Sequence, residues 1–495
     1  MRRSLRYNIV ANVLGGGVNM VGQLVALPLA LIIAGPQAYG VWVALFAIVQ
    51  LSALFDLGLA PALIRRVAEL SARENEEERL RAVTATSFLT NGALSLAAGT
   101  ITALAALAIS VGASEGAVSG SDSAALAGIA VAAAVLGVIF RQFEAVIRGI
   151  QRFDVERLHQ TIAILGRIAA LGVLLVADGG IVAVALVEAF TFLLSPLLSG
   201  IRMRRFAPFF SWSPRRYDRR EARALLRFGV SWFSLASATQ LAAFLPTFLA
   251  ALLAGPSSAT AVGAGLRVAQ ALRQTMAWLL DPLLPNLMTL DGGRRERLTV
   301  RGTLALAILG AAVIVPLILE APALMQLWLG ERAPWAQAAS YFQAFGLAAL
   351  LTVVHLTVAV VVQAQNRPAY FALATWVSAS GTLALLAAAF LVAPELGPAS
   401  IVAVAIVSEA LFLIRVVTAI PGPVFRLVLK EVAVAALAAL VAIGVWALAR
   451  PLLQVAPLVD VALAGVIYVA AFAGAYLGLR RLTGGPGPAA ALSSS

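Results

Sequence analysis

Residues 124–140 read AALAGIAVAAAVLGVIF, an uncharged run that is followed closely by Arg141, Glu144 and Arg148. Continued to residue 147, the run is long enough to cross a bilayer as a helix. The three charged residues recur at spacings of three and four, which place them on one face of that helix. The stretch therefore predicts a membrane-spanning helix with a charged face near one end.

The composition extends this prediction to the whole chain. Of its 495 residues, 61% are hydrophobic and only 12% are charged, and a soluble domain cannot bury so much apolar surface. Fourteen spans of roughly 20 to 22 residues would use almost all of the hydrophobic residues. The sequence thus predicts an all-α, polytopic membrane protein with about fourteen transmembrane helices.

Apolar runs divided by glycine, proline or clusters of charge locate these helices. The predicted spans are 8–33, 39–64, 82–111, 124–147, 158–177, 181–201, 228–254, 259–283, 303–329, 337–362, 369–392, 399–420, 431–449 and 458–479.

Arginine and lysine predict the orientation. Thirty of the 36 basic residues lie in alternate connections, whereas the other connections hold only Arg332 and Arg450. Basic residues accumulate in cytoplasmic loops, so we expect both termini in the cytoplasm. The net charge of +12 is then a topology signal that can also meet anionic lipid headgroups, and no nucleic-acid partner is expected.

Two short matches indicate an internal repeat. LIIAGP at 31–36 returns as ALLAGP at 251–256, and IVAVA at 181–185 returns at 401–405, both at an offset of 220. The first six and the next six spans therefore look like parallel repeats, which is a transporter architecture. The predicted domains are an N-lobe (1–201), an amphipathic cytoplasmic linker (202–227), a C-lobe (228–420), two extra C-terminal spans (421–482) and a disordered tail (483–495).

Polar side chains within spans are costly in hydrocarbon and should face water or a partner. Asn8, Asn12, Asn19 and Gln23 fall within about 60° on the first span. In the eighth span Arg267, Gln270, Gln274 and Asp281 form a similar stripe, and Arg273 points elsewhere.

These stripes, with the cationic face of residues 141–148 and Arg167 in the fifth span, suggest a hydrated cavity that receives an anionic cargo. The alternative is internal salt bridging, since Glu144 can neutralise Arg141 or Arg148. The candidate substrate-binding residues are Arg267, Gln270, Gln274, Arg141, Arg148, Arg167, Asn12, Asn19 and Gln23.

Glu188 and Glu409 occupy nearly equivalent positions in the sixth and twelfth spans. Either carboxyl could couple transport to an ion gradient, or it could be a hydrogen-bonded group that holds a helix pair together. The chain has no cysteine, only two histidines and a single lysine, Lys430, so no phosphate-binding loop or zinc motif can be written. We expect no metal, no cofactor and no enzymatic activity.

Three motifs carry a family resemblance: Tyr39-Gly40, Asp56-Leu57-Gly58-Leu59 followed by Arg65, and Arg148-Gly149-Ile150-Gln151-Arg152-Phe153. They resemble the polysaccharide-biosynthesis (Wzx-type) flippases of the multidrug/oligosaccharidyl-lipid/polysaccharide exporter superfamily. The resemblance implies alternating access that moves an undecaprenyl-pyrophosphate-linked oligosaccharide from the cytoplasmic to the outer leaflet of the bacterial inner membrane. It also implies a polyprenyl-linked sugar, membrane lipid and polysaccharide assembly proteins as partners.

One departure concerns the eighth span, where family members often carry an aromatic residue in a Val-Gly-x-Tyr string. This chain has Val262-Gly263-Ala264-Gly265 instead. A drug or cation antiporter and a lipid II flippase of the same superfamily are the alternatives. A membrane glycosyltransferase, ligase or polymerase is disfavoured because the outer connections are short and carry only scattered acids.

Overall fold

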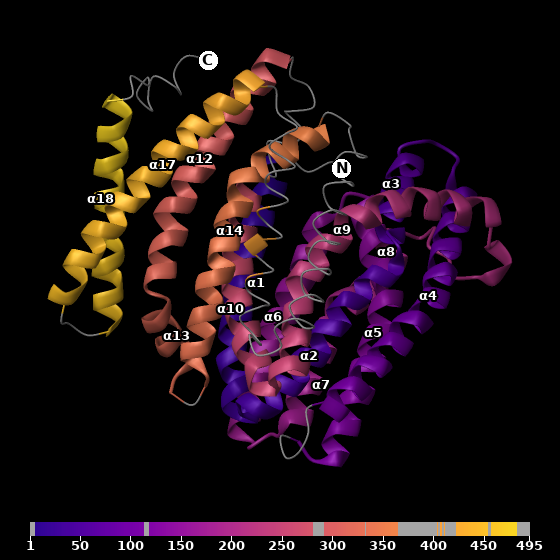
Figure 1. The fold of residues 1–495 in the computed structure, drawn as a ribbon. Coiled ribbons are helices and arrows are strands. Elements are labelled where there is room, and N and C mark those ends of the chain that lie inside the picture. The colour runs from indigo at the N-terminus through magenta and orange to yellow at the C-terminus, as the bar shows by residue number, and fades with distance from the viewer. Residues whose placement is uncertain are drawn as a thin grey trace. The chain divides into compact units, whose positions relative to one another are not determined.

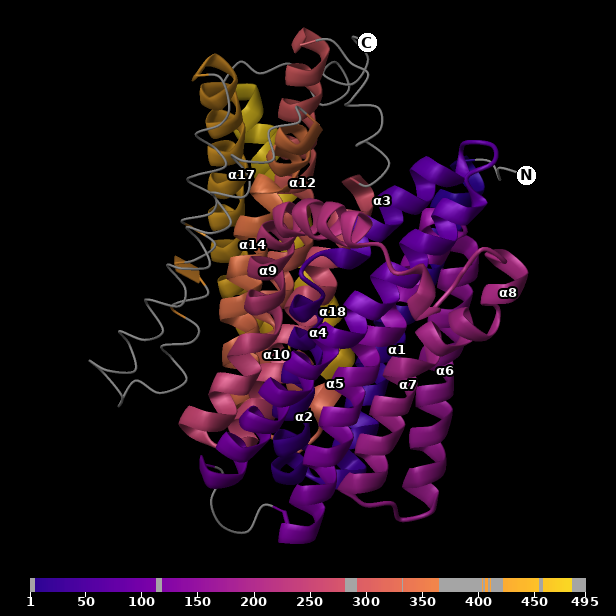
Figure 2. The same cartoon turned by 90° about the vertical axis from the view of Figure 1, so that its right-hand side faces the viewer.

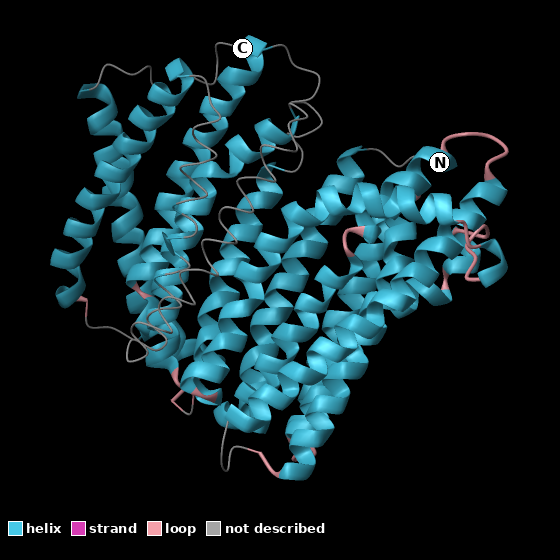
Figure 3. Ribbon diagram, turned by 45° about the vertical axis from the view of Figure 1, so that its right-hand side comes forward, coloured by secondary structure: helices cyan, strands magenta, loops and turns pink. Residues whose placement is uncertain are grey.

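The computed structural model describes residues 5–112, 118–280, 292–331, 333–364, 422–453 and 457–482, together with a few single positions between 403 and 410. Throughout these residues the chain is helical, with short turns between helices (Figures 1 and 3). The helices pack into two compact units, one built from the chain up to Ala264 and the other mainly from Gly265 onward. The division falls inside one helix, so the predicted lobe boundaries at 201 and 228 stay a prediction.

The first unit is a bundle of long helices whose sequence neighbours are joined by tight connections. Its elements are α1 (Leu5–Ala34), α2 (Pro36–Leu51), η1 (Ser52–Asp56), α3 (Leu59–Ser71), α4 (Glu77–Gly112), α5 (Gly120–Gly149), α6 (Phe153–Val176), α7 (Ile181–Ile201), α8 (Met203–Phe206), η2 (Pro214–Arg216), α9 (Arg219–Ala254) and the start of α10 (Pro256–Leu280).

The second unit holds the remainder of α10 and the helices after it. They are α12 (Gly292–Leu319), α13 (Ala321–Leu329), α14 (Trp335–Ala364), α17 (Gly422–Ala449), η4 (Arg450–Leu452) and α18 (Pro457–Leu482). Along α18, Tyr468, Phe472 and Tyr476 stack on one face and pack against α12 and α17. This aromatic face joins the two C-terminal helices to the rest of the unit.

The predicted all-α, polytopic fold is confirmed. Within the described residues, nine helical segments are long and apolar enough to cross a membrane. The predicted span 181–201 coincides with α7, and most other boundaries differ by a few residues. The predicted spans 369–392 and 399–420 lie outside the described residues, apart from single positions.

Two spans that the sequence predicts as continuous helices are divided in the structure, so this prediction was wrong. The span 39–64 is divided after η1, because Leu57 and Gly58 adopt left-handed conformations with φ of 47° and 76°. The Oδ1 atom of Asp56 accepts a hydrogen bond from the Gly58 amide at 2.7 Å and holds this turn. Such a local backbone reversal ends a helix without interrupting the apolar pattern.

The span 303–329 is divided at Glu320, between α12 and α13. Pro322 lies in the first turn of α13, where a proline cannot donate to the carbonyl four residues earlier. That carbonyl belongs to Ile318, and it accepts a hydrogen bond from Gln343 Nε2 of α14 at 3.3 Å. The break is therefore compensated by a neighbouring helix, as a membrane interior requires.

Small and polar residues bring α4 and α5 together. Ser87 Oγ donates to Gln142 Oε1 at 2.7 Å, and Asn91 Nδ2 donates to the Val138 carbonyl at 2.8 Å. The side chains of Ser87, Asn91 and Gln142 are fully or almost fully buried. Interhelical hydrogen bonds between small residues are typical of packing in a membrane, where apolar burial alone does not favour association between helices.

The closest approach between α9 and the turn after η1 occurs at two glycines. A Cβ atom on Gly58 would lie 2.2 Å from the Gly229 carbonyl oxygen, and a Cβ atom on Gly229 would lie 2.6 Å from the Leu57 carbonyl oxygen. Only hydrogen fits between the two backbones at this crossing. Gly229 is therefore a packing requirement rather than a flexible point in α9.

We expect Gly229→Ala to destabilise the protein. An alanine normally stabilises a helix interior by about 1 kcal/mol relative to glycine, but here the methyl group must displace backbone, at a cost of roughly 1–3 kcal/mol. The matched control is Gly172→Ala in α6, where nothing lies within 4 Å of the added methyl group. Thermal unfolding of the purified protein in detergent should show opposite shifts for the two variants, and equal shifts would contradict the crossing.

Candidate functional site

A buried carboxylate, Glu188 of α7, is the centre of a polar cluster in the first unit. It forms an ion pair with Arg167 of α6. Trp42 Nε1 donates to its Oε2 atom at 2.9 Å, and Tyr39 donates its hydroxyl to Oε1 at 3.3 Å. Because Tyr39 and Trp42 lie one turn apart on α2, one carboxylate joins α2, α6 and α7. The coupling role predicted for Glu188 must operate through these partners.

On the charged face of α5, the partners differ from the internal salt bridges of Glu144 that were the predicted alternative to a cavity. Arg148 binds Glu156 of α6 through two hydrogen bonds, of 2.7 Å from Nε and 2.5 Å from Nη2. Glu144 instead accepts a 2.5 Å hydrogen bond from Ser195 Oγ of α7. Arg141 lies within electrostatic range of Asp56 and Glu144. Thus Arg148 connects α5 to α6, and Arg141 interacts with carboxylates of η1 and α5.

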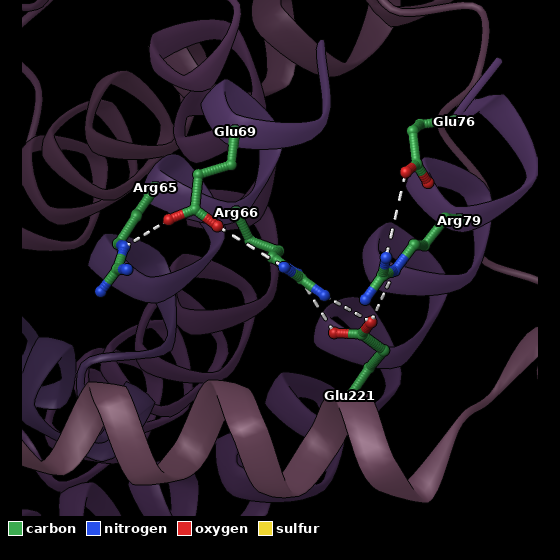
Figure 4. A network of polar contacts seen from close by, with 6 residues as sticks. All are labelled: Arg65, Arg66, Glu69, Glu76, Arg79 and Glu221. Carbon is green, nitrogen blue, oxygen red and sulfur yellow. Dashed lines mark hydrogen bonds and ion pairs between the residues drawn. The ribbon is translucent and has the colours of Figure 1, made fainter. Parts of the chain in front are cut away.

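A third cluster fastens α9 to α3 and to the start of α4 (Figure 4). Glu221 of α9 is almost fully buried and accepts from two arginines, Arg66 Nη2 at 2.8 Å and Arg79 Nε at 3.2 Å. Glu69 of α3 adds a 2.6 Å contact with Arg65 Nε and a 3.5 Å contact with Arg66 Nη1. The Glu221 carboxylate thereby holds α9 against α3 and α4, which lie far from it in sequence.

The charges in this third cluster reinforce one another. The hydrogen bond from Arg65 lowers the pKa of Glu69, and the hydrogen bond to Glu221 raises the pKa of Arg66. Since the pKa of Glu69 is lower in the folded protein, its contribution to stability is present above its ordinary pKa and is lost as pH falls through the lowered value. The side chain of Glu69 is 36% exposed, so solvent screens the interaction and that contribution is small.

The predicted polar stripes are only partly described. In α1, Gln23 Nε2 donates to Asn19 Oδ1 at 2.7 Å, and Gln23 is exposed. Asn8 and Asn12 lie in the same helix, but their side chains fall outside the described residues, and so do Asp281 and Glu409. The hydrogen bond between Asn19 and Gln23 agrees with the predicted shared face.

The predicted residues of α10 belong to the second unit. Arg267 and Gln270 are half-buried, and Gln274 is exposed. Arg141, Arg148 and Arg167 belong to the first unit, so a cavity shared by these two sets of residues stays a prediction.

A cavity of about 1030 Å³ lies between α4 and α5 within the first unit. Its walls are mostly alanine, valine and leucine side chains, and its hydroxyl groups come from Ser110 and Ser123. None of the predicted cationic residues lines it. Its chemistry suits an apolar chain rather than a charged headgroup.

The second unit contains a carboxylate cluster that resembles the one around Glu188. Glu320, which is almost fully buried, accepts from Trp446 Nε1 at 2.9 Å and pairs with Arg450 Nε at 3.1 Å. Arg450 also binds Asp460 Oδ2 at 2.5 Å. The cluster connects the α12–α13 break to both C-terminal helices, α17 and α18.

The model of the polysaccharide biosynthesis protein family matches residues 5–284, more than half of the chain. The chain belongs to this family. No curated protein matches this family member in sequence.

The fold of this family member is that of known transporters. The lipid II flippase MurJ in an inward closed conformation superimposes with a TM-score of 0.70 at 12% identity, over 95% of this chain and 100% of that one. An inward-facing multidrug resistance MATE transporter of the MOP superfamily gives 0.61 at 17% identity, over 88% and 96%. The eukaryotic MATE transporter AtDTX14 gives 0.55 at 13% identity, over 86% and 97%. The predicted polysaccharide-biosynthesis family is confirmed by the family match, and these three likenesses show a shared fold.

Sequence reasoning missed the partners of the predicted residues. Tyr39 and Trp42 share a face of α2 at a spacing of three, which was the available signal for a polar contact from that helix. Glu156 follows the tight turn after α5, where Gln151 has φ of 60° and turns the chain back. No local pattern indicates that this turn brings Glu156 to Arg148.

We expect removal of Arg167 to cost more stability than removal of an exposed ion-pair partner. Arg167→Ala leaves Glu188 as a buried charge without its cation, a loss of roughly 3–5 kcal/mol. The double variant with Glu188→Gln should recover part of it, because no uncompensated charge remains. Glu77→Gln, which breaks an exposed contact with Arg81, should cost less than about 1 kcal/mol.

Thermal unfolding of these variants and of Glu188→Gln alone tests this. If the losses of stability in the two single variants simply add up to the loss in the double variant, Arg167 and Glu188 do not act as a unit.

Proposed function

We propose that this protein is a flippase that translocates an undecaprenyl-pyrophosphate-linked oligosaccharide from the cytoplasmic to the outer leaflet by alternating access. It acts as a transporter and not as an enzyme. It lies in the bacterial inner membrane with both termini in the cytoplasm, as the uneven distribution of arginine supports. The cargo is recognised without a cofactor.

The observation that carries this proposal is that a member of the polysaccharide biosynthesis family keeps Arg141, Arg167 and Arg267 inside predicted spans. A pyrophosphate cannot cross hydrocarbon without a polar partner, whereas a polyprenyl tail never has to leave it. Arginine suits the pyrophosphate because its fork donates two parallel hydrogen bonds and stays charged when partly desolvated.

Two of the predicted substrate contacts, Arg148 and Arg167, are engaged by carboxylates of the first unit. Arg148 is engaged by Glu156, so its role in our proposal is to position α5 against α6. Arg167 can bind cargo only when its contact with Glu188 loosens, and this exchange is the coupling role that we assign to Glu188. Arg267, with Gln270 and Gln274 on the same stripe of α10, is the first contact that we propose for the pyrophosphate.

The remaining assignments rest on the repeat. Asn12, Asn19 and Gln23 on α1 contribute neutral polar contacts for the sugar, and Glu409 is the counterpart of Glu188 in the second half. The two six-helix lobes rock against each other, and polysaccharide assembly proteins receive the product. These roles are proposals that depend on the parallel repeat and on the family.

A lipid II flippase is the second candidate, and the overlap with MurJ along nearly the whole chain favours it over a drug antiporter. Both flippase assignments share a polyprenyl pyrophosphate headgroup. An antiporter that binds cationic drugs would gain nothing from arginines in its spans.

We expect Arg267→Ala to block flipping while the protein still inserts. The measurement is the fraction of lipid-linked oligosaccharide that remains on the cytoplasmic leaflet, assayed in inside-out and right-side-out membrane vesicles. Loss of one charge-assisted contact should slow flipping roughly tenfold or more.

The matched control is Arg273→Ala, which removes the same side chain from another face of α10. Unchanged flipping in Arg267→Ala would remove Arg267 from the site. Equal loss in both variants would show that the helix, and not the stripe, is affected. If lipid II alone accumulates, the cargo assignment moves to the second candidate.

A further inference from the structure

The helix α9 is too long to lie wholly within a bilayer. Its 36 residues would extend about 54 Å at 1.5 Å per residue, whereas the hydrocarbon core is about 30 Å thick. Its first turns run across the ends of neighbouring helices, beside α3 and the start of α4 (Figures 1 and 2). We therefore expect the beginning of α9 to lie along the membrane interface and its later part, which includes the apolar segment Ala243–Ala254, to enter the bilayer.

One face of this interfacial segment is occupied by the protein. Glu221, Ala222, Leu225 and Gly229 are buried, and they lie within about 100° of one another around the helix axis. Glu221 is held by Arg66 and Arg79, as Figure 4 shows. This face attaches α9 to the rest of the first unit.

The opposite face is exposed and strongly basic. Arg219, Arg220, Arg223 and Arg227 are all exposed and also lie within about 100°. No carboxylate among the described residues forms an ion pair with any of these four arginines. We name these four residues the arginine face of α9. These four arginines differ from those of α3 and α4, which form ion pairs with glutamates.

Aromatic and aliphatic side chains place this face at the level of lipid headgroups. Trp212 is 63% exposed and Tyr217 is 43% exposed in the connection that precedes α9. Val230, one turn beyond Arg227 on the same face, is 53% exposed. Tryptophan and tyrosine gather at membrane interfaces because their rings are apolar and their tips are polar.

We propose that the arginine face of α9 binds the phosphate headgroups of anionic phospholipids in the cytoplasmic leaflet. Guanidinium groups pair with phosphate through two parallel hydrogen bonds, and the anionic leaflet attracts basic segments at its surface. An acidic protein would satisfy the charges but not the exposed Trp212, Tyr217 and Val230, which a lipid interface does. The choice of leaflet rests on the proposed cytoplasmic position of both termini, whereas binding of the headgroup does not depend on the cargo.

The binding attaches the beginning of α9 to the membrane surface, while Glu221 attaches it to α3 and α4. A movement of this segment away from α3 and α4 would break the arginine contacts to Glu221, and a movement away from the membrane surface would break the lipid contacts. Anionic lipid is thus a ligand of the connection between the two predicted lobes.

The experiment uses the full-length protein purified in detergent and mixed with dioleoylphosphatidylglycerol or dioleoylphosphatidylcholine, with retained lipids counted by native mass spectrometry. The test variant is the triple substitution Arg219→Gln, Arg223→Gln and Arg227→Gln. We expect its affinity for the phosphatidylglycerol to fall at least about tenfold, because each arginine near an anionic surface contributes separately. Its affinity for the phosphatidylcholine should not change.

The matched control removes three other exposed arginines, by Arg73→Gln, Arg426→Gln and Arg481→Gln. It has the same net charge as the test variant and should keep the preference for phosphatidylglycerol. A triple replacement of Arg219, Arg223 and Arg227 by lysine should retain most of that preference, since lysine also carries the charge.

Two results would overturn the proposal. One is a test variant that retains phosphatidylglycerol as well as the wild type does. The other is a control variant whose affinity for phosphatidylglycerol falls as much as that of the test variant. The effect would then depend on net charge and not on the arginine face of α9. Thermal unfolding of each variant checks that the exposed substitutions leave the fold intact. Flipping activity decides the cargo separately, so either proposal can fail alone.

Discussion

A charge that is buried between membrane-spanning helices must find a partner there, and this constraint shapes both units of the protein. Glu188 and Glu320 each accept from an arginine and from a tryptophan indole, and each joins three segments of the chain. Removing one partner of such a pair leaves a charge that hydrocarbon cannot solvate. While these contacts are made, each glutamate holds the helices around it together, and the exchange that we propose for Arg167 requires its contact with Glu188 to loosen.

Much of the fold could be predicted because the bilayer leaves few solutions. Backbone polar groups have to be satisfied within a segment, so an apolar run of about 20 residues becomes a helix whatever its neighbours do. The span 181–201 contains no charged residue except Glu188, and its ends at Gly180 and Arg202 coincide with the limits of α7. Helical spacing also placed Asn19 and Gln23 on one face, where they share a hydrogen bond.

The remainder depended on contacts that no local pattern contains. Arg148 is four residues from Glu144, yet it pairs with Glu156, because the turn after α5 brings the first turn of α6 within reach. The helix breaks at Gly58 and Glu320 could not be predicted from hydropathy, because the residues on both sides of each break are apolar. Hydropathy indicates which segments lie in the membrane. Where a helix breaks and which side chains pair depends on the helices that pack against it.

The glutamate at the α12–α13 break has a consequence for how this chain could have evolved. Its arginine and tryptophan partners come from Arg450 and Trp446, in and just after α17. An ancestor that ended before this hairpin would have carried a bare anion in its interior. The terminal hairpin is therefore what allows an acidic side chain to be buried at this helix break.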